Sequence, residues 1–293
     1  MGSDFLLFVL IGFAAQIIDG AIGMAYGLIS ATVLLSLGTS PATASASVHA
    51  AEVFTTAASA ASHWRFGNVD KRLFWNLAPA GMVGGALGAY VLTSAPGTAI
   101  RPIVSVYLGV MGAVILWKAL RRPREAKEAR RTPLLGLFGG FLDAVGGGGW
   151  GPLVTSTLLG QGTRARVAIG STNAAEFLVT VTISATFVMT IGLELWPIIL
   201  GLVLGGVLAA PFAAYVTRKL PDRRLMILVG VGIMLLSTRE VLRVLRAGWP
   251  TRKGEEQPYS ITSSARARSG RRVNTNLSKI ASFRWRHSHD EAH

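Results

Sequence analysis

Long apolar segments recur along this chain of 293 residues and leave it few folds to adopt. Each segment provides at least the roughly 20 residues that a helix needs to cross a bilayer. Eight can be read, over residues 5–37, 42–62, 73–94, 100–120, 133–159, 168–191, 195–216 and 225–245. Because lipid offers the backbone no hydrogen-bond partners, such segments fold as helices. The sequence predicts an all-α, polytopic, multi-pass protein of the cell (inner) membrane.

Charge supports the same class of protein. Only 15% of the residues are charged, whereas soluble domains carry about 25%. The net charge of +14 gathers between apolar segments and in the carboxyl-terminal tail, as in the cytoplasmic loops of membrane proteins. This placement argues against nucleic acid as a partner, which needs a basic face on a folded domain. The absence of cysteine excludes disulfides and thiolate metal sites.

The second half of the chain repeats the first. Asp19 and Asp143, Gly23 and Gly147, Gly27 and Gly151, and Glu52 and Glu176 are each 124 positions apart, as 143 is from 19. We therefore expect a first membrane repeat at 1–120, a basic cytoplasmic connector at 121–132, a second repeat at 133–249, and a basic, disordered tail at 250–293. Four segments fall in each half. The sequence predicts two homologous halves.

The sequence leaves the relative orientation of the halves open. Eight plain crossings place the connector and both termini in the cytoplasm, but the basic loop 217–224 then faces outward, against the positive-inside rule. If the first segment of each half is a hairpin of two half-helices, the halves are inverted repeats and this loop is cytoplasmic. The carboxyl end is then outside.

Glycine interrupts the first segment of each half, in "IDGAIGMAYG" at 18–27 and "LDAVGGGGWG" at 142–151. Each Gly costs a helix about 1 kcal/mol relative to Ala, so the four consecutive glycines at 146–149 should break it. Broken backbone at membrane depth is tolerated where protein buries it or where it lines a cavity, and half-helix amino termini attract anions. We expect the two breaks to meet and to bind an anion, with a structural hinge as the alternative. The glycines at 81–88 and 201–206 indicate close helix packing.

Four carboxylates fall inside apolar segments: Asp19, Glu52, Asp143 and Glu176. An ionised side chain at the bilayer centre costs about 2.5 to 3.5 kcal/mol, so these groups must be paired, protonated or functional. The aspartates can cap the half-helices that follow them or can act in function, and the sequence does not decide between these roles. The glutamates, each flanked by Ala-Ala, are expected to take up protons as an anion arrives.

One helical turn before the glutamates lie His49 and Asn173. Residues at i and i+3 share a helix face, so each of these side chains should accompany its glutamate. Histidine can exchange a proton near neutral pH, whereas asparagine only makes hydrogen bonds. The difference predicts two similar sites with unequal tasks, although a polar residue of this kind also serves as a bond between helices.

The motifs "IDGAIGMAYG", "GGGGWGP" and "GSTNAAEF" make the chain resemble the TauE/SafE sulfite exporter family, also called the toluene sulfonate uptake permease family. The likeness covers about residues 5–246. It implies a small carrier with seven or eight spans in two homologous halves, and it implies sulfite, sulfonates or related organosulfur anions as substrates. The basic tail and the His49–Asn173 mismatch depart from the usual pattern.

The prediction is a secondary transporter that moves sulfite or a sulfonate by alternating access and couples this transport to protons. The alternative is a membrane-embedded enzyme or an assembly factor that moves no solute. No cofactor, metal or catalytic residue is expected. The expected partners are the anion and the lipid bilayer, and a homo-oligomer is left open. The predicted substrate-binding residues are Asp19, Gly20, Gly23, Gly27, His49, Glu52, Asp143, Gly146, Gly147, Gly148, Gly149, Asn173 and Glu176.

Overall fold

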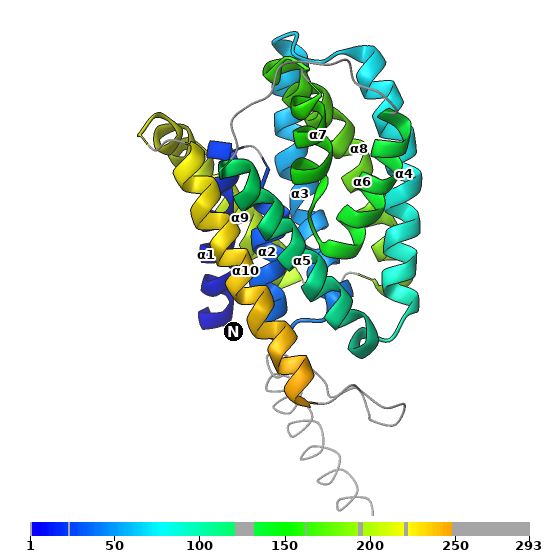
Figure 1. Cartoon of the computed structure of the whole chain (residues 1–293), viewed down its shortest axis with the longest axis vertical. Helices are drawn as coiled ribbons and strands as arrows, with labels where there is room; N and C mark the ends of the chain where they lie inside the picture. The colour runs from blue at the N-terminus through cyan, green and yellow to red at the C-terminus, as the bar shows by residue number, and fades with distance from the viewer. Residues whose placement is uncertain are drawn as a thin grey trace, which may run out of the picture. The chain divides into compact units, whose positions relative to one another are not determined.

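Helices make up the fold (Figure 1). The computed structural model describes residues 2–22, 24–120, 132–161, 163–192, 196–219 and 222–247, which form helices and no strand. The helices are α1 (Gly2–Ile22), α2 (Tyr26–Ser36), α3 (Pro41–Arg65), α4 (Lys71–Ser94), α5 (Gly97–Leu120), α6 (Thr132–Gly146), a π-helical turn (Gly151–Thr155), α7 (Ser156–Gly160), α8 (Ala165–Ile191), α9 (Trp196–Lys219) and α10 (Asp222–Ala247). The all-α prediction is confirmed for these residues.

Helix boundaries follow capping residues in the sequence. Ser40 opens α3 by accepting a hydrogen bond from the Thr43 backbone N–H at 3.0 Å, with Pro41 in the first turn. Asp70 opens α4, where its Oδ1 accepts from the Arg72 N–H at 2.8 Å and from the Leu73 N–H at 3.1 Å. Such caps satisfy backbone donors that the first turn of a helix leaves free. They place the starts of both helices within two residues of the predicted starts at 42 and 73.

The matched helices of the two halves run in opposite directions. On α5 and α10, a Cβ at Gly109 would lie 3.5 Å from Ser237, and one at Gly112 would lie 3.0 Å from Ile233. Position numbers rise along one helix as they fall along the other. The same holds for α3 and α8, where the Asn173 amide donates to Ser59 and the His49 ring lies 6.3 Å from Phe187. The halves are therefore inverted repeats.

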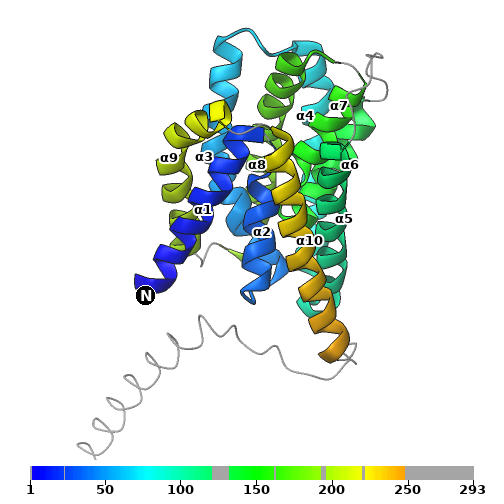
Figure 2. The ribbon, with the colours of Figure 1, turned by 60° about the vertical axis from the view of Figure 1, so that its left-hand side comes forward.

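Each half begins with a hairpin. The carboxyl end of α2 lies beside the start of α5, because the Arg101 guanidinium donates to the Leu35 carbonyl at 2.8 Å. The start of α1 lies at that same end of the bundle, so α2 turns back beside α1, as Figure 2 shows. In the second half, α6 and the short helix α7 flank the glycine-rich break in the same way. Of the two topologies left open by the sequence, the structure has the inverted one.

The two halves interlock. The first helix of each half packs along its length on the fourth helix of the other half, α1 on α9 and α6 on α4. Small residues allow these close approaches, since a Cβ at Gly140 would lie 2.9 Å from the Gly81 carbonyl carbon, and one at Gly205 would lie 2.6 Å from the Phe13 nitrogen. The expectation that glycines at 81–88 and 201–206 serve helix packing is confirmed.

The predicted count of eight crossings remains a prediction. Three described helices are long and apolar enough to span a membrane by length and composition, at Lys71–Ser94, Gly97–Leu120 and Arg166–Ile191. Shorter apolar helices occur at Phe5–Asp19, Tyr26–Ser36, Thr132–Gly146 and Trp196–Ala209. At the glycine-rich sequence, the first predicted segment is divided into α1 and α2, and the fifth into α6, the π-helical turn and α7. The connector, apart from Thr132, and the tail lie outside the described residues.

Candidate functional site

The two helix breaks touch each other, although they are far apart in sequence. A Cβ on Gly27 would lie 2.8 Å from the Gly148 Cα and 2.9 Å from the Gly147 carbonyl oxygen. A Cβ on Gly151 would lie 2.7 Å from the Met24 Cβ. Only residues without side chains fit at this contact between Gly27 and Gly148. The proximity expected from the matched positions of the two breaks is confirmed.

The second break ends α6 in a specific backbone conformation. Gly147 has φ of +69°, and the following Gly148 N–H donates to the Asp143 carbonyl at 3.1 Å. This bond over six residues, with a left-handed glycine, is the Schellman arrangement that closes helix carboxyl ends. The chain then passes through Gly148 and Gly149, both with positive φ. It re-enters helix at Trp150 as a π-helical turn.

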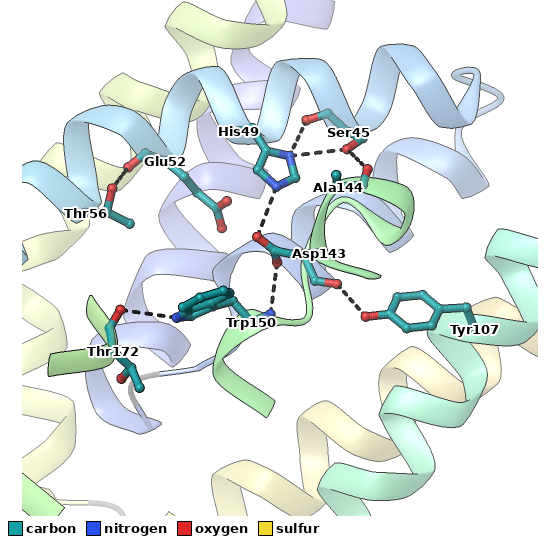
Figure 3. Close-up of polar contacts among 10 residues, drawn as sticks. Ser45, His49, Glu52, Thr56, Tyr107, Asp143, Ala144, Trp150 and Thr172 are labelled. Atoms are coloured by element: carbon teal, nitrogen blue, oxygen red, sulfur yellow. Dashed lines mark hydrogen bonds and ion pairs between the residues drawn. The ribbon is translucent and has the colours of Figure 1, made fainter. Parts of the chain in front are cut away.

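Asp143 joins three parts of this break (Figure 3). Its Oδ1 accepts from the Trp150 backbone N–H at 2.9 Å, and so caps the π-helical turn. Its Oδ2 lies 3.3 Å from Nε2 of His49 on α3, and the Asp143 and His49 side chains are 2% and 0% exposed. The Trp150 indole donates to the Thr172 carbonyl on α8 at 3.2 Å. Asp143 therefore both caps a half-helix and contacts a titratable side chain.

Asp19 repeats only part of this arrangement. Its Oδ1 accepts from the Ala25 N–H at 2.7 Å and from the Tyr26 N–H at 3.0 Å, which caps α2. Tyr26 is the repeat counterpart of Trp150, and its hydroxyl likewise donates to a backbone carbonyl, that of Leu202, at 3.0 Å. Capping, one of the two roles left open by the sequence, is thus seen at both aspartates.

Glu52 lies directly at the contact between the breaks. Its Oε1 would be 2.7 Å from a Cβ on Gly27, and the residue is 7% exposed. Asp19, Asp143 and Glu176 are all close enough to interact with it electrostatically. In the described ranges, no Lys or Arg forms an ion pair with these four carboxylates. The acids that the sequence singled out therefore gather around the paired breaks, and no described Lys or Arg pairs with them.

Asn173 holds the repeat position of His49 in the other half but has a different kind of partner. Its amide donates to the Ser59 hydroxyl on α3 at 2.8 Å, which makes a bond between helices.

Among the other predicted residues, Gly20 lies inside α1, which continues to Ile22, so the first break starts later than expected. Gly23 lies outside the described residues. Gly146 and Gly149 pack against the Tyr107 side chain, whose hydroxyl donates to the Gly148 carbonyl at 3.2 Å.

Sequence reasoning missed several residues that shape the site. Ser45, one turn before His49, donates from its hydroxyl to the Ala144 carbonyl at 2.5 Å and so ties α3 to the end of α6. Lys118 donates to the Pro152 carbonyl at 2.6 Å, in the π-helical turn. The signal for Ser45 was its helical spacing from His49, and that for Lys118 was a cation inside an apolar segment.

A second polar cluster lies at the carboxyl end of α2. Glu240 on α10 binds Arg101 at 3.0 Å and Arg243 at 2.7 Å, and these arginines donate to the Leu35 and Ser36 carbonyls. The Glu240 side chain is 2% exposed. Its charge inside the predicted segment 225–245 should have marked it by the rule applied to Glu52. This cluster fastens the first hairpin to α5 and α10.

Inverted repeats with paired broken helices are typical of secondary transporters, which build their binding sites from such breaks. Among the described residues, no group of three or more His, Asp or Glu could hold a metal ion. The chain matches the family described as sulfite exporter TauE/SafE over residues 8–239. It is also 41% identical over 247 residues to the "Probable membrane transporter protein YtnM" of Bacillus subtilis (strain 168), covering 81% of this chain and 82% of that one.

The chain belongs to the TauE/SafE sulfite exporter family, and the predicted family is confirmed. It is a membrane protein of a transporter family. No solved structure gives a significant match to it.

Proposed function

We propose that this protein is a secondary transporter of a small anion, either sulfite or a sulfonate, which binds at the contact between the two helix breaks. The family description and the name of the Bacillus subtilis relative support transport. The observation that carries the location is the contact of Gly27 with Gly148 beside the buried Glu52. Backbone donors and half-helix amino termini at such a contact favour an anion.

Proton coupling follows from the charges around the breaks. Glu52 and Glu176 lie near Asp143 and Asp19, with no paired Lys or Arg in the described ranges. An ionised glutamate would repel an anion and would itself be costly to bury. A protonated glutamate is neutral and donates a hydrogen bond that the anion can accept. The anion and protons therefore bind together, and a proton gradient drives accumulation.

The inverted repeat also fits one orientation in the cell membrane. The end of α5 and the start of α10 lie at the same end of the bundle, because these helices are antiparallel. The basic connector and the basic loop 217–224 both extend from that end. The positive-inside rule places it in the cytoplasm, with both termini on the other side.

Flux measured in proteoliposomes tests the function. The purified full chain is reconstituted and given a pH gradient, and uptake is followed for sulfite, methanesulfonate, sulfate and chloride. We expect gradient-driven accumulation of sulfite or methanesulfonate. The Glu52→Gln and Glu176→Gln variants should keep exchange across the membrane and lose accumulation, with Glu176 at least as important as Glu52.

The control is Asp70→Asn, which removes a carboxylate at the start of α4, away from the breaks, and keeps a capping side chain. Accumulation by both Gln variants with the wild-type pH dependence would show that the glutamates are structural. If no tested anion moves in any variant, a membrane-embedded enzyme or assembly factor becomes the better hypothesis.

A further inference from the structure

The His49 ring has a defined protonation pattern at Nδ1. This nitrogen lies 2.8 Å from the Ser45 carbonyl oxygen and 3.2 Å from the Ser45 hydroxyl oxygen. The carbonyl can only accept, and the hydroxyl already donates to the Ala144 carbonyl. Both neighbours of Nδ1 therefore need a donor, so Nδ1 carries a proton.

The other ring nitrogen then faces a carboxyl group. Nε2 lies 3.3 Å from the Asp143 Oδ2, and both side chains are buried. In a neutral ring protonated at Nδ1, Nε2 offers only a lone pair, and a carboxylate also offers only lone pairs. Two buried acceptors at this distance repel each other. One proton must therefore lie between them, on the ring or on the carboxyl group.

We propose that His49 and Asp143 form a proton-binding site in which one proton is shared between Nε2 and Oδ2 and latches α3 to the second helix break. With this proton the pair is neutral, and without it the pair carries one negative charge. Loss of the proton leaves two acceptors facing each other, so the contact between α3 and α6 loosens. The proposal rests on the proposed transport function and adds a proton site distinct from the two glutamates.

Several titratable groups face the pair and influence its proton. Glu52 on α3 and Glu176 on α8 both interact with Asp143, and Tyr107 on α5 does so from the opposite side of the break. Asp19 on α1 interacts with the two glutamates, and Tyr26 on α2 interacts with Glu52 and Asp19. From α8 the Phe187 ring also faces His49, with ring centroids 6.3 Å apart, and it does not titrate.

The other half of the repeat cannot form this site. The counterpart of His49 is Asn173, whose amide binds Ser59, and the counterpart of Ser45 is Ile169. Asp19 therefore caps α2 but has no histidine to share a proton with. Among the described residues there is one such pair, and its repeat mate is a control within the same molecule.

Asp143→Asn is the decisive variant. Its amide nitrogen donates to Nε2, and its carbonyl oxygen still accepts from the Trp150 N–H, so the contact and the cap are kept while the shared proton is lost. It imitates the permanently protonated pair. Asp19→Asn is the matched control, because it also keeps a capping oxygen but touches no histidine.

Nitrogen NMR of the full chain in lipid nanodiscs, labelled at histidine and assigned with His49→Gln, reads the proton without any anion. In the wild type we expect Nδ1 to stay protonated and Nε2 to lose one proton in a single step as pH rises. Asp143→Asn should abolish that step, and Asp19→Asn should retain it. A wild-type His49 that is bare at Nδ1, or an unchanged step in Asp143→Asn, would overturn the proposal.

A second measurement links the proton to the anion. Methanesulfonate stays ionised, so the pH dependence of its dissociation constant reports protons bound by the protein. One obligatory proton makes the constant rise about tenfold per pH unit above the titration of the site. Asp143→Asn should lower that slope by one tenfold step per unit, and Asp70→Asn, at the start of α4, should leave the slope as in the wild type.

The outcomes separate this proposal from the transport function. Binding of methanesulfonate with equal slopes in the wild type and in Asp143→Asn contradicts the proton site alone. Absence of binding and flux for every anion contradicts the transport function, while the NMR result still decides whether the pair holds its proton. If Asp143→Asn fails to fold, the wild-type spectrum still decides, because a His49 ring without a proton at Nδ1, or without a single step at Nε2, would contradict the shared proton.

Discussion

The two helix breaks share one plan and differ in what their aspartates hold. Asp19 uses one oxygen to cap α2 through two backbone N–H groups. Asp143 uses one oxygen to cap the π-helical turn and directs the other to His49. The first break leads into an ordinary helix of 11 residues, whereas the second passes through three glycines of positive φ into a π-helical turn. Duplicated segments can thus keep a structural role in one copy and gain a titratable partner in the other.

Removing each aspartate should give the largest difference between the breaks. Asp143→Ala leaves the buried His49 and the Trp150 N–H without their partner, and breaking a buried pair costs about 3 to 5 kcal/mol. Asp19→Ala loses only a helix cap, which costs about 1 kcal/mol. Denaturant unfolding in detergent micelles measures both free energies. Equal losses would mean that the His49 contact adds nothing and that the two breaks are equivalent.

Three glycine-to-alanine changes separate crowding from backbone strain. Gly148 combines a φ of +150° with the close contact to Gly27. Gly27 has the contact without a positive φ, and Gly38 has a φ of +101° with no atom within 4 Å of an added Cβ. Strain costs about 1 to 3 kcal/mol and overpacking about 1 to 3 kcal/mol. We expect Gly148→Ala to lower the thermal unfolding temperature by about the sum of the shifts caused by the other two. A shift no larger than that of Gly38→Ala would show that the breaks are not in contact.

Two serine-to-alanine changes on α3 should have the smallest effects. Ser45 is 1% exposed and bonds the second break through Ala144, whereas Ser59 is half-buried and bonds Asn173. A net hydrogen bond contributes about 0.5 to 1.5 kcal/mol. We expect Ser45→Ala to lie at the upper end of this range in denaturant unfolding, and Ser59→Ala at or below the lower end. The reverse order would place the tighter bond on α8.

Much of the fold follows from residues that act locally. Apolar length set the helices, and α8 ends at Ile191 as predicted, where Gly192 with φ of +72° follows. The inverted topology did not follow, because loop charges favour each topology in part. The antiparallel contacts of α5 with α10 and of α3 with α8 decide it. The first break lies inside the predicted window 18–27, but α1 continues past Gly20 to Ile22, because a single glycine costs a helix only about 1 kcal/mol.

The candidate site shows the same division. The carboxylates were identified because burying a charge is costly wherever the helix packs. The role of Asn173 was not predicted, because the repeat aligns this residue with His49, whereas its actual partner, Ser59, depends on helix packing. The bond of Arg101 to Glu240 joins residues 139 positions apart, and no local pattern marks such a pair. Residue type thus predicts which groups need partners, and tertiary packing chooses the partners.

The interlocked packing of α1 on α9 and α6 on α4 means that neither half can complete its own interior. A polypeptide that stopped after α5 would leave the glycine face of α4 uncovered until a second copy supplied the missing helix. Because the matched helices are antiparallel, that copy would have to enter the bilayer upside down. The contacts of this single chain are those of an antiparallel dimer of half-length subunits, joined into one gene product by the connector.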